Sequence, residues 1–354
     1  MDDNVFTRTS VKETDIALQI QPHMRIRKEN RFNAVMLDMM ARTSTYLRLT
    51  DQNSTEYRLQ GTYTRGTTGP NSITIDFGYR RETILRGTVE NDLVGGSPLM
   101  RRVLHGSLTG RKQFNRLSVD TQIIGVRQRY ENVQDSVGES ISQHFRNVTR
   151  FGLRGVGYYE LSSRTSIFTS LEYDRYNYAK SALLENRDAE NLSGTAGIRY
   201  ELTRILYAQL GVGYRRYDFK ERALSPISGL AVSGHLRYFP SRVLSIRGMI
   251  EQSNTTSPYD IVGAVTLTTT SVEVEYEMRR SLSFLAISKF ALEDYAKQDY
   301  AARRVEVSAG PRLRFNRWLS ADASIGCAKR FVNGAAPFEP YTQFYGLLSI
   351  TFAR

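Results

Sequence analysis

The sequence predicts an all-β fold, a transmembrane antiparallel up-and-down β-barrel. Apolar and polar side chains alternate along many segments, as in strands that separate two different environments. Short turns recur at a nearly constant spacing, with a longer polar connection between successive turns. No apolar run approaches the roughly 18 residues that a membrane-spanning helix needs. A barrel wall whose strands each have one apolar face and one polar face accounts for all three observations.

The clearest strand covers residues 304–315. Its apolar face carries Val305, Val307, Ala309, Leu313 and Phe315, and its polar face carries Arg304, Glu306, Ser308, Gly310, Arg312 and Arg314. Residues 316–318 interrupt this pattern, which then resumes from Leu319 to Ile325. Because successive side chains of a strand point to opposite faces, we interpret this region as two strands joined by a short turn.

The same unit recurs along the chain. In order, alternation predicts strands at residues 15–27, 32–46, 56–65, 73–80, 103–111, 117–128, 151–159, 167–173, 192–200, 206–214, 230–238, 244–250, 272–278, 282–286, 304–315, 319–325 and 344–352. Eight short turns lie near residues 30, 70, 115, 163, 203, 241, 280 and 316, and the last six contain Arg116, Arg164, Arg204, Arg242, Arg280 and Arg317. A propeller blade would need four strands in each repeat, whereas each repeat here has room for two.

This strand count has a consequence for the chain ends. Seventeen strands is an odd number, whereas single-chain bacterial barrels have an even number and both termini on the short-turn side. We therefore expect eighteen strands in the intact barrel, with one of them upstream of Met1 and residues 1–14 as the first extracellular loop. The polar opening MDDNVFTRTS is not a signal peptide, which we attribute to truncation or processing.

Composition agrees with one barrel domain over residues 1–354. The chain has a formal net charge of +12, and no composition shift or low-complexity tract marks a domain boundary. The 21 Tyr and 16 Phe against one Trp suit strands better than helices. The single cysteine, Cys327, lies on the apolar face of its strand, so we expect a small buried or lipid-facing side chain rather than a nucleophile.

The polar faces predict a water-filled lumen. The candidate lumen-lining residues, which would form a substrate path, are Arg58, Arg80, Arg154, Arg199, Arg215, Arg237, Arg247, Glu273, Glu275, Arg312 and Arg314. Such a lumen would be an electropositive passage that favours anions or acidic sugars. Alternatively, neighbouring strands could pair these charges into ladders that hold the barrel round. The candidate interfacial aromatic belt is Tyr159, Tyr200, Tyr214, Tyr238, Trp318 and Phe352.

The sequence contains no recognisable catalytic motif. The four histidines, His23, His105, His144 and His235, lack metal-ligand spacing, and no nucleophile elbow is present. Pairs such as Gly155 and Gly157 lie within alternating strands rather than in phosphate-binding loops. Arginines spaced two residues apart along strands, without a binding helix, disfavour nucleic acid. We therefore expect a protein that is not an enzyme and that uses no cofactor, metal or nucleic acid.

The N-terminal region also carries a family resemblance. Residues 2–6 read DDNVF, Thr14 and Asp15 lead to Gln21 and Pro22, and the following strand pairs end in Tyr57 and Arg58. With these features the chain resembles the "putative β-barrel porin 2" family of outer-membrane proteins, and the rest matches in the style of its repeats. The family also has proline at the position of Pro22. Members are often associated with exopolysaccharide synthesis and export.

The resemblance implies a conduit in the outer membrane of a Gram-negative cell through which a secreted polysaccharide leaves. The expected partners are the lipid bilayer, the polysaccharide, periplasmic polysaccharide-export proteins and the barrel assembly machinery. Assembly signals usually end on an aromatic residue, and here Ala353 and Arg354 follow Phe352. The alternative functions are a general diffusion porin for small anionic solutes and a structural or adhesive barrel with a plugged lumen.

Overall fold

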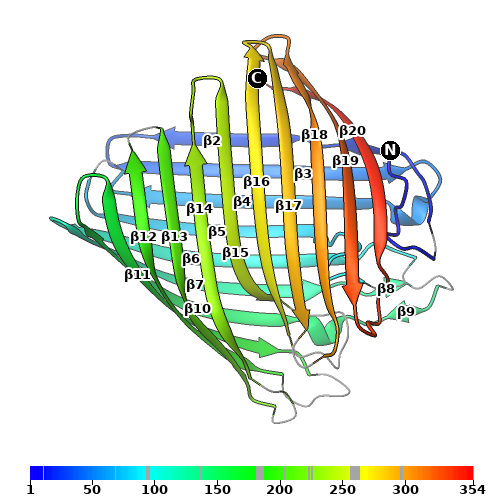
Figure 1. The fold of residues 1–354 in the computed structure, drawn as a ribbon, viewed down its shortest axis with the longest axis horizontal. Coiled ribbons are helices and arrows are strands. Elements are labelled where there is room, and N and C mark those ends of the chain that lie inside the picture. Colours follow the sequence, from blue (N-terminus) through cyan, green and yellow to red (C-terminus); the bar gives the residue numbers. More distant parts are fainter. Residues whose placement is uncertain are drawn as a thin grey trace.

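Antiparallel strands make up almost the whole molecule (Figure 1). The computed structural model describes residues 1–10, 12–67, 69–92, 96–134, 138–180, 187–202, 205–221, 224, 226–255, 264–295 and 298–353. Its elements are β1 (Ala17–Ile20), β2 (His23–Glu29), β3 (Asn33–Tyr46), η1 (Thr50–Gln52), β4 (Ser54–Arg65), β5 (Ser72–Thr83), β6 (Met100–Phe114), β7 (Leu117–Tyr130), β8 (Val133–Gln134), β9 (Ser140–Ile141), η2 (His144–Arg146), β10 (Val148–Glu160), β11 (Thr165–Tyr178), β12 (Ala189–Leu202), β13 (Leu206–Phe219), β14 (Ile227–Tyr238), β15 (Leu244–Thr255), β16 (Val265–Arg279), β17 (Leu282–Tyr295), β18 (Ala301–Arg314), β19 (Leu319–Asn333) and β20 (Tyr341–Phe352). Among these residues no helix is long and apolar enough to cross a membrane.

Each main strand pairs with the next one along the chain, so the sheet has the predicted up-and-down order. β1 and β2 both pair with β3 and together form one interrupted crossing, whereas β8 and β9 form a separate small hairpin. This leaves seventeen crossings, as the sequence predicted. Short turns alternate with longer connections at the predicted positions, although the turn residues Thr203 and Arg204 lie outside the described part of the chain.

Two prolines explain local irregularities in the strands. Pro22 falls in the break between β1 and β2, where its carbonyl still accepts a hydrogen bond of 3.1 Å from the amide of Ala41. Pro311 lies inside β18, and the pairing of β18 with β19 passes from Ala309 directly to Arg312. A missing N–H interrupts the ladder at both places without changing which face the following residues occupy.

The first and last parts of the sheet meet at the end that carries the longer connections. Asp2 forms antiparallel bridges to both Tyr345 in β20 and Asp15 before β1. The Met1 amino group donates to the Gly346 carbonyl at 2.9 Å, and the Gly346 amide donates to the Met1 carbonyl at 2.8 Å. These bonds connect the two edges of the barrel wall at this level. The expected eighteenth strand stays a prediction.

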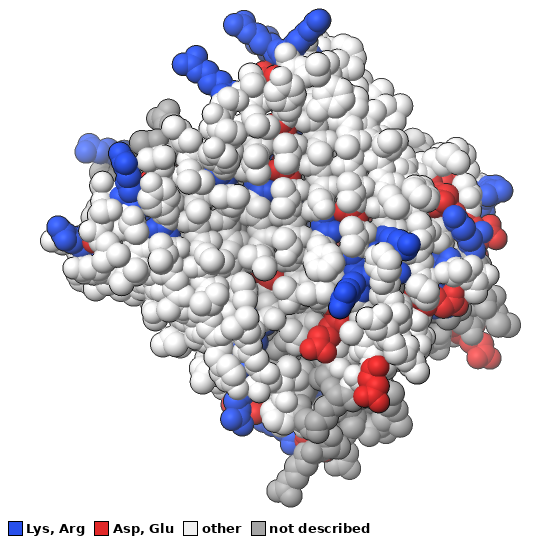
Figure 2. Space-filling model, in the orientation of Figure 1, with Lys and Arg blue, Asp and Glu red and all other residues white. Residues whose placement is uncertain are grey.

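The two faces of the sheet differ in composition as the alternation requires. The outer face exposes large apolar side chains such as Ile325 and Leu348, which are 76% and 74% exposed. In Figure 2 the middle of the visible face is mostly uncharged, and the charged side chains gather toward its margins. Exposure of so much apolar surface fits a face that contacts hydrocarbon.

The buried apolar residues form three clusters that involve the longer connections. One contains Val89, Val265, Tyr295, Ala302 and Phe338. A second contains Ile84, Leu99, Tyr130 and Val133, and a third contains Ala189, Tyr217 and Ala264. The packed core therefore lies at the long-connection end of the barrel, whereas polar side chains cover most of the inner wall.

Candidate functional site

The strand register assigns the inner face of the wall. Arg330 in β19 binds Asp92 in the segment between β5 and β6, which lies inside the barrel, and it also binds Glu293 in β17. Residues opposite each other in a ladder share a face, so Asp322, on the face of Arg330, places its partner Arg312 on the inner face. Following the register around the sheet puts all the predicted lumen-lining residues on this face: Arg58, Arg80, Arg154, Arg199, Arg215, Arg237, Arg247, Glu273, Glu275, Arg312 and Arg314. They lie around the wall and do not converge on one point.

Most of the inward charges are paired across neighbouring strands. The pairs across strands, by closest atoms, are Arg58 with Asp38 (3.0 Å), Arg111 with Asp120 (2.7 Å), Arg150 with Asp174 (2.8 Å), Lys289 with Glu306 (3.1 Å), Arg247 with Glu273, and Arg312 with Asp322. Arg80 pairs with Glu82 within β5 (2.9 Å). Four other predicted arginines make different described contacts: Arg154 donates to Ser170, Arg199 lies over Tyr158, Arg215 donates to the Gln252 carbonyl, and Arg237 lies over Tyr207. The wall is thus rich in hydrogen-bonding groups.

The short-turn mouth of the lumen carries an excess of positive charge. A cavity of about 220 Å³ lies among the β14–β15 turn, the β16–β17 turn and the end of β18. Five arginines line it, Arg242, Arg247, Arg279, Arg280 and Arg314, against only two carboxylates, Glu275 and Glu277. Arginine guanidinium groups in such an arrangement attract anions entering the lumen from this side.

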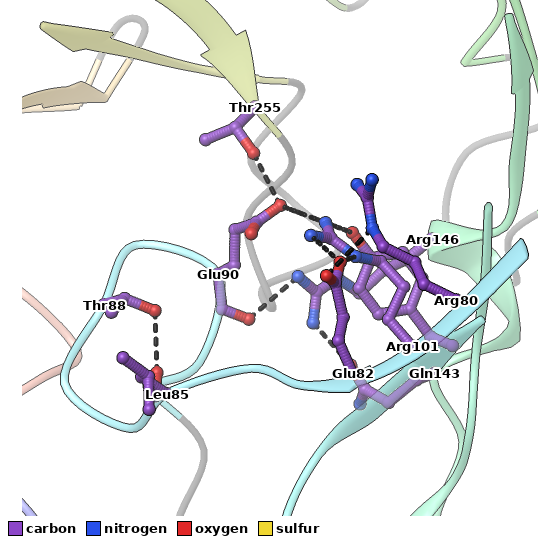
Figure 3. A network of polar contacts seen from close by, with 10 residues as sticks. Arg80, Glu82, Leu85, Thr88, Glu90, Arg101, Gln143, Arg146 and Thr255 are labelled. Carbon is purple, nitrogen blue, oxygen red and sulfur yellow. Dashed lines mark hydrogen bonds and ion pairs between the residues drawn. The ribbon is translucent and has the colours of Figure 1, made fainter. Parts of the chain in front are cut away.

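The opposite end of the lumen is crossed by the connection between β5 and β6. We call its described residues, 84–92 and 96–99, the cap segment. The Glu90 carboxylate accepts hydrogen bonds of 2.9 Å from Arg101 in β6 and 2.8 Å from Thr255 at the end of β15 (Figure 3). Arg146 donates to the Glu90 backbone carbonyl at 2.8 Å. Glu90 therefore ties three separate parts of the chain together.

The cap segment also reaches the opposite wall. The Arg330 guanidinium, only 1% exposed as a side chain, binds Asp92 of the cap segment and Glu293 of β17. The Tyr295 hydroxyl lies 3.0 Å from the same guanidinium, and Tyr341 of β20 donates to the Gly87 carbonyl at 3.1 Å. Since these contacts lie across the barrel from Arg101, the segment spans the lumen at this end.

The end of β15 contributes to the same obstruction. β14 and β15 pair only between Ser233–Tyr238 and Ile246–Glu251, and the ladder stops there although both strands continue. The freed end of β15 instead contacts groups inside the barrel, because Arg215 donates to the Gln252 carbonyl at 2.6 Å and Thr255 binds Glu90. In Figure 1 the two strands visibly diverge.

The predicted aromatic belt residues have outward or terminal positions. Tyr159, Tyr200, Tyr238, Trp318 and Phe352 lie near the short-turn ends of their strands, whereas Tyr214 lies closer to the other end of β13. Phe352 is 81% exposed and Tyr214 is 58% exposed. This distribution fits aromatic side chains at a membrane interface, which remains a prediction.

The role of the cap residues was not predicted from the sequence. The region before Arg101 was expected to be a polar connection, and the length of this connection was the only signal of a structural role. The predicted absence of a metal site was based on histidine spacing; in the described residues no group of three or more His, Cys, Asp or Glu could hold a metal ion. His23 and His105 instead pair with Asp38 and Asp76, each at 3.0 Å.

An antiparallel wall with an apolar outside and a polar inside defines an outer-membrane β-barrel. The model of one family, described as "Putative beta-barrel porin 2", matches residues 1–341, and the chain belongs to this family. This confirms the resemblance and the outer-membrane location. No curated protein matches the chain.

A solved structure of an iron transporter shares the fold. The apoprotein form of the FrpB iron transporter from Neisseria meningitidis (F5-1 variant) is 10% identical, with a TM-score of 0.53, and the match covers 91% of this chain and 62% of that one. The chain thus spans about three fifths of the FrpB length. The copper transporter OprC (10% identity, TM-score 0.48, coverage 99% and 74%) and a "bacterial polysaccharide outer membrane secretin" (13%, 0.40, 92% and 100%) are more distant in structure.

Proposed function

We propose that this porin-family barrel is a gated conduit for export of an exopolysaccharide. The polymer would enter at the short-turn mouth, pass along the polar inner wall and leave past the cap segment. The proposal combines the export role that the family resemblance implies with the chemistry of the inner wall. Motion would be driven by synthesis or by periplasmic export proteins.

The observation that carries this proposal is the pairing of charges along the lumen. Because Arg58, Arg150 and Arg312 each have a carboxylate partner, much of the wall offers donors and acceptors in balance rather than bare positive charge. Sugar hydroxyl groups both donate and accept hydrogen bonds, so such a wall suits a hydroxyl-rich chain. The cap segment would have to move for a polymer to pass.

A general diffusion porin for small anions is the second candidate. It is favoured by the arginine excess at the short-turn mouth, where Arg242, Arg279 and Arg280 line the cavity of about 220 Å³. A barrel with a permanently plugged lumen is the remaining alternative, and the cap segment is the feature that would plug it.

Two experiments separate these functions. Deletion of the gene is expected to reduce surface or secreted polysaccharide, and normal polysaccharide in the deletion strain would overturn the export proposal. In planar bilayers, block by long oligosaccharides supports export, whereas large currents with anion selectivity and no block support the porin. A plugged barrel would show neither current nor block.

A further inference from the structure

A polar cavity of about 270 Å³ lies on the inner wall where β15 leaves β14. Side chains from β7 to β13 line one side, and residues 251–254 of β15 line the other. The bond of 2.6 Å from Arg215 to the Gln252 carbonyl joins the two sides across the intervening β14. The cavity therefore exists because the end of β15 bends into the barrel.

Charges in this cavity are balanced, unlike those at the short-turn mouth. Its lining contains three arginines, Arg150, Arg154 and Arg215, and three acidic residues, Glu172, Asp174 and Glu251. Arg150 is already engaged, by Asp174 at 2.8 Å and by Glu172 at 3.2 Å. A site of this composition provides no net attraction for an anion, but it provides many donors and acceptors at short range.

One of its buried polar groups lacks a partner. Asn191, which lines the cavity and is 5% exposed, donates from Nδ2 to Asp174 at 3.2 Å. Its Oδ1 atom is buried and has no hydrogen-bond partner among the described residues. A buried acceptor left unsatisfied costs free energy, so a rotation of the Asn191 amide that turns Oδ1 toward a donor group in the cavity is favoured.

The cavity also has donors to spare. Arg154 donates only from Nε, to the Ser170 hydroxyl at 3.4 Å, and no carboxylate of the described residues lies within ion-pair distance of it. Gln122 contributes a further amide. Donors and acceptors thus face a common cavity, whose volume is about nine times the ~30 Å³ that a water molecule occupies in the liquid.

We propose that this cavity is a binding subsite for one neutral, hydroxyl-rich sugar unit. A sugar hydroxyl donates to Asn191 Oδ1 once the amide turns toward the cavity, while other hydroxyls accept from Arg154 and Gln122. The inference deepens the proposed function, on which it rests for the identity of the polymer, by assigning the site at which a sugar unit pauses beneath the cap. It also separates a neutral-sugar site from the basic mouth, where anions are attracted.

The test is isothermal titration of the purified barrel in detergent with neutral hexasaccharides, maltohexaose and cellohexaose, and with acidic hexagalacturonate. We expect at least one neutral hexasaccharide to bind more tightly than the acidic one. Asn191→Ala and Arg154→Gln should each weaken that binding roughly three- to tenfold, because each removes a hydrogen bond to the ligand. Heat-modifiable electrophoretic mobility checks that each variant is folded.

Gln113→Ala is the matched control, because Gln113 is an amide on the inner face of β6 outside the cavity, near the short turn. It should bind as the unmodified protein does. No binding of either neutral sugar, preferred binding of the acidic sugar, or unchanged affinity in the folded Arg154→Gln variant would overturn the subsite. Normal polysaccharide in the deletion strain, together with neutral-sugar binding that depends on Asn191, would remove export and leave the subsite standing.

Discussion

The Arg330 guanidinium decides how firmly the cap segment is held. It is buried between two carboxylates, those of Asp92 and Glu293, which come from the cap segment and from β17. It also lies 4.0 Å from the centroid of the Phe338 ring. Removing one member of a buried charge cluster leaves the others uncompensated, which typically costs about 3–5 kcal/mol.

We expect Arg330→Gln to release the cap segment, since Asp92 and Glu293 would then be buried as unpaired charges. Single-channel recordings should show larger or more frequent openings than the unmodified barrel. Arg303→Gln is the control, because Arg303 is an exposed arginine on β18 outside this cluster. Equal conductance in both variants would argue against a latch at Arg330.

The same cluster predicts a dependence on pH. Burial raises the pKa of the Asp92 carboxyl from an ordinary value of 3.8 to about 6, and the neighbouring charge of Glu293 adds to the effect against the opposing influence of Arg330. A carboxyl whose pKa is raised in the closed state binds its proton more tightly there. The closed state therefore gains stability as pH falls through 6 toward 4, and it loses this gain as pH rises through the same window.

Conductance should accordingly be lower at pH 5 than at pH 7.5, as measured in bilayers at constant salt. Asp92→Asn keeps an acceptor for Arg330 and removes the titrating group, so it should flatten this part of the pH profile. The idea fails if the profile of the Asn variant matches that of the unmodified barrel.

At the scale of strands, glycines set how closely β12 and β13 approach. A Cβ atom added at Gly213 would lie 1.9 Å from the Gly194 carbonyl oxygen, and one added at Gly197 would lie 2.0 Å from that of Leu210. Neither contact is sterically possible, so a larger residue would push the strands apart.

Gly213→Ala should lower barrel stability by about 1–3 kcal/mol, the cost typical of overpacking. Urea titration followed by heat-modifiable mobility measures this change. Gly125→Ala on β7 is the matched control, because an added Cβ there meets nothing within 4 Å. It should be neutral or slightly stabilising, since alanine restricts the unfolded chain; an equal loss in both variants would contradict the close-approach argument.

The strands were predicted well from the sequence because successive side chains of a strand face two different environments, so apolar and polar residues alternate along it. The face of Arg312, for example, follows from alternation alone, and the proline in β18 did not shift it. Alternation ends at Ile250, where the predicted strand also ended, and the polar residues 252–255 could not show that β15 continues beside β16 while it leaves β14.

At the scale of the whole molecule, the cap was beyond sequence reasoning. Asp92 and Arg330 are separated by 238 positions, and neither the charge nor the spacing of either residue distinguishes it from other polar residues. Only the curvature of the sheet into a barrel-like wall brings them together. The same curvature determines which face contacts lipid, which the alternation did predict.

The orientation of the wall can be tested on one strand. Leu348→Arg places a charge on the outer face of β20 and should destabilise the membrane-embedded barrel by about 2–4 kcal/mol if it lies near the bilayer midplane. Ser349→Arg, its neighbour on the inner face, should assemble nearly normally. Outer-membrane abundance and urea midpoints measure both, and a greater defect in Ser349→Arg would reverse the assigned faces.

Because the β14–β15 ladder ends early, the barrel wall resists stretching less at this place than elsewhere around its circumference. Elsewhere, widening must break rows of backbone bonds, but here amides of β14 beyond Ser233 already lack a partner in β15, while β15 remains bonded to β16 as far as Thr255. Dilation would therefore begin at this seam, with β15 and β16 swinging as a pair. Amide deuterium uptake should be fastest along that margin of β14.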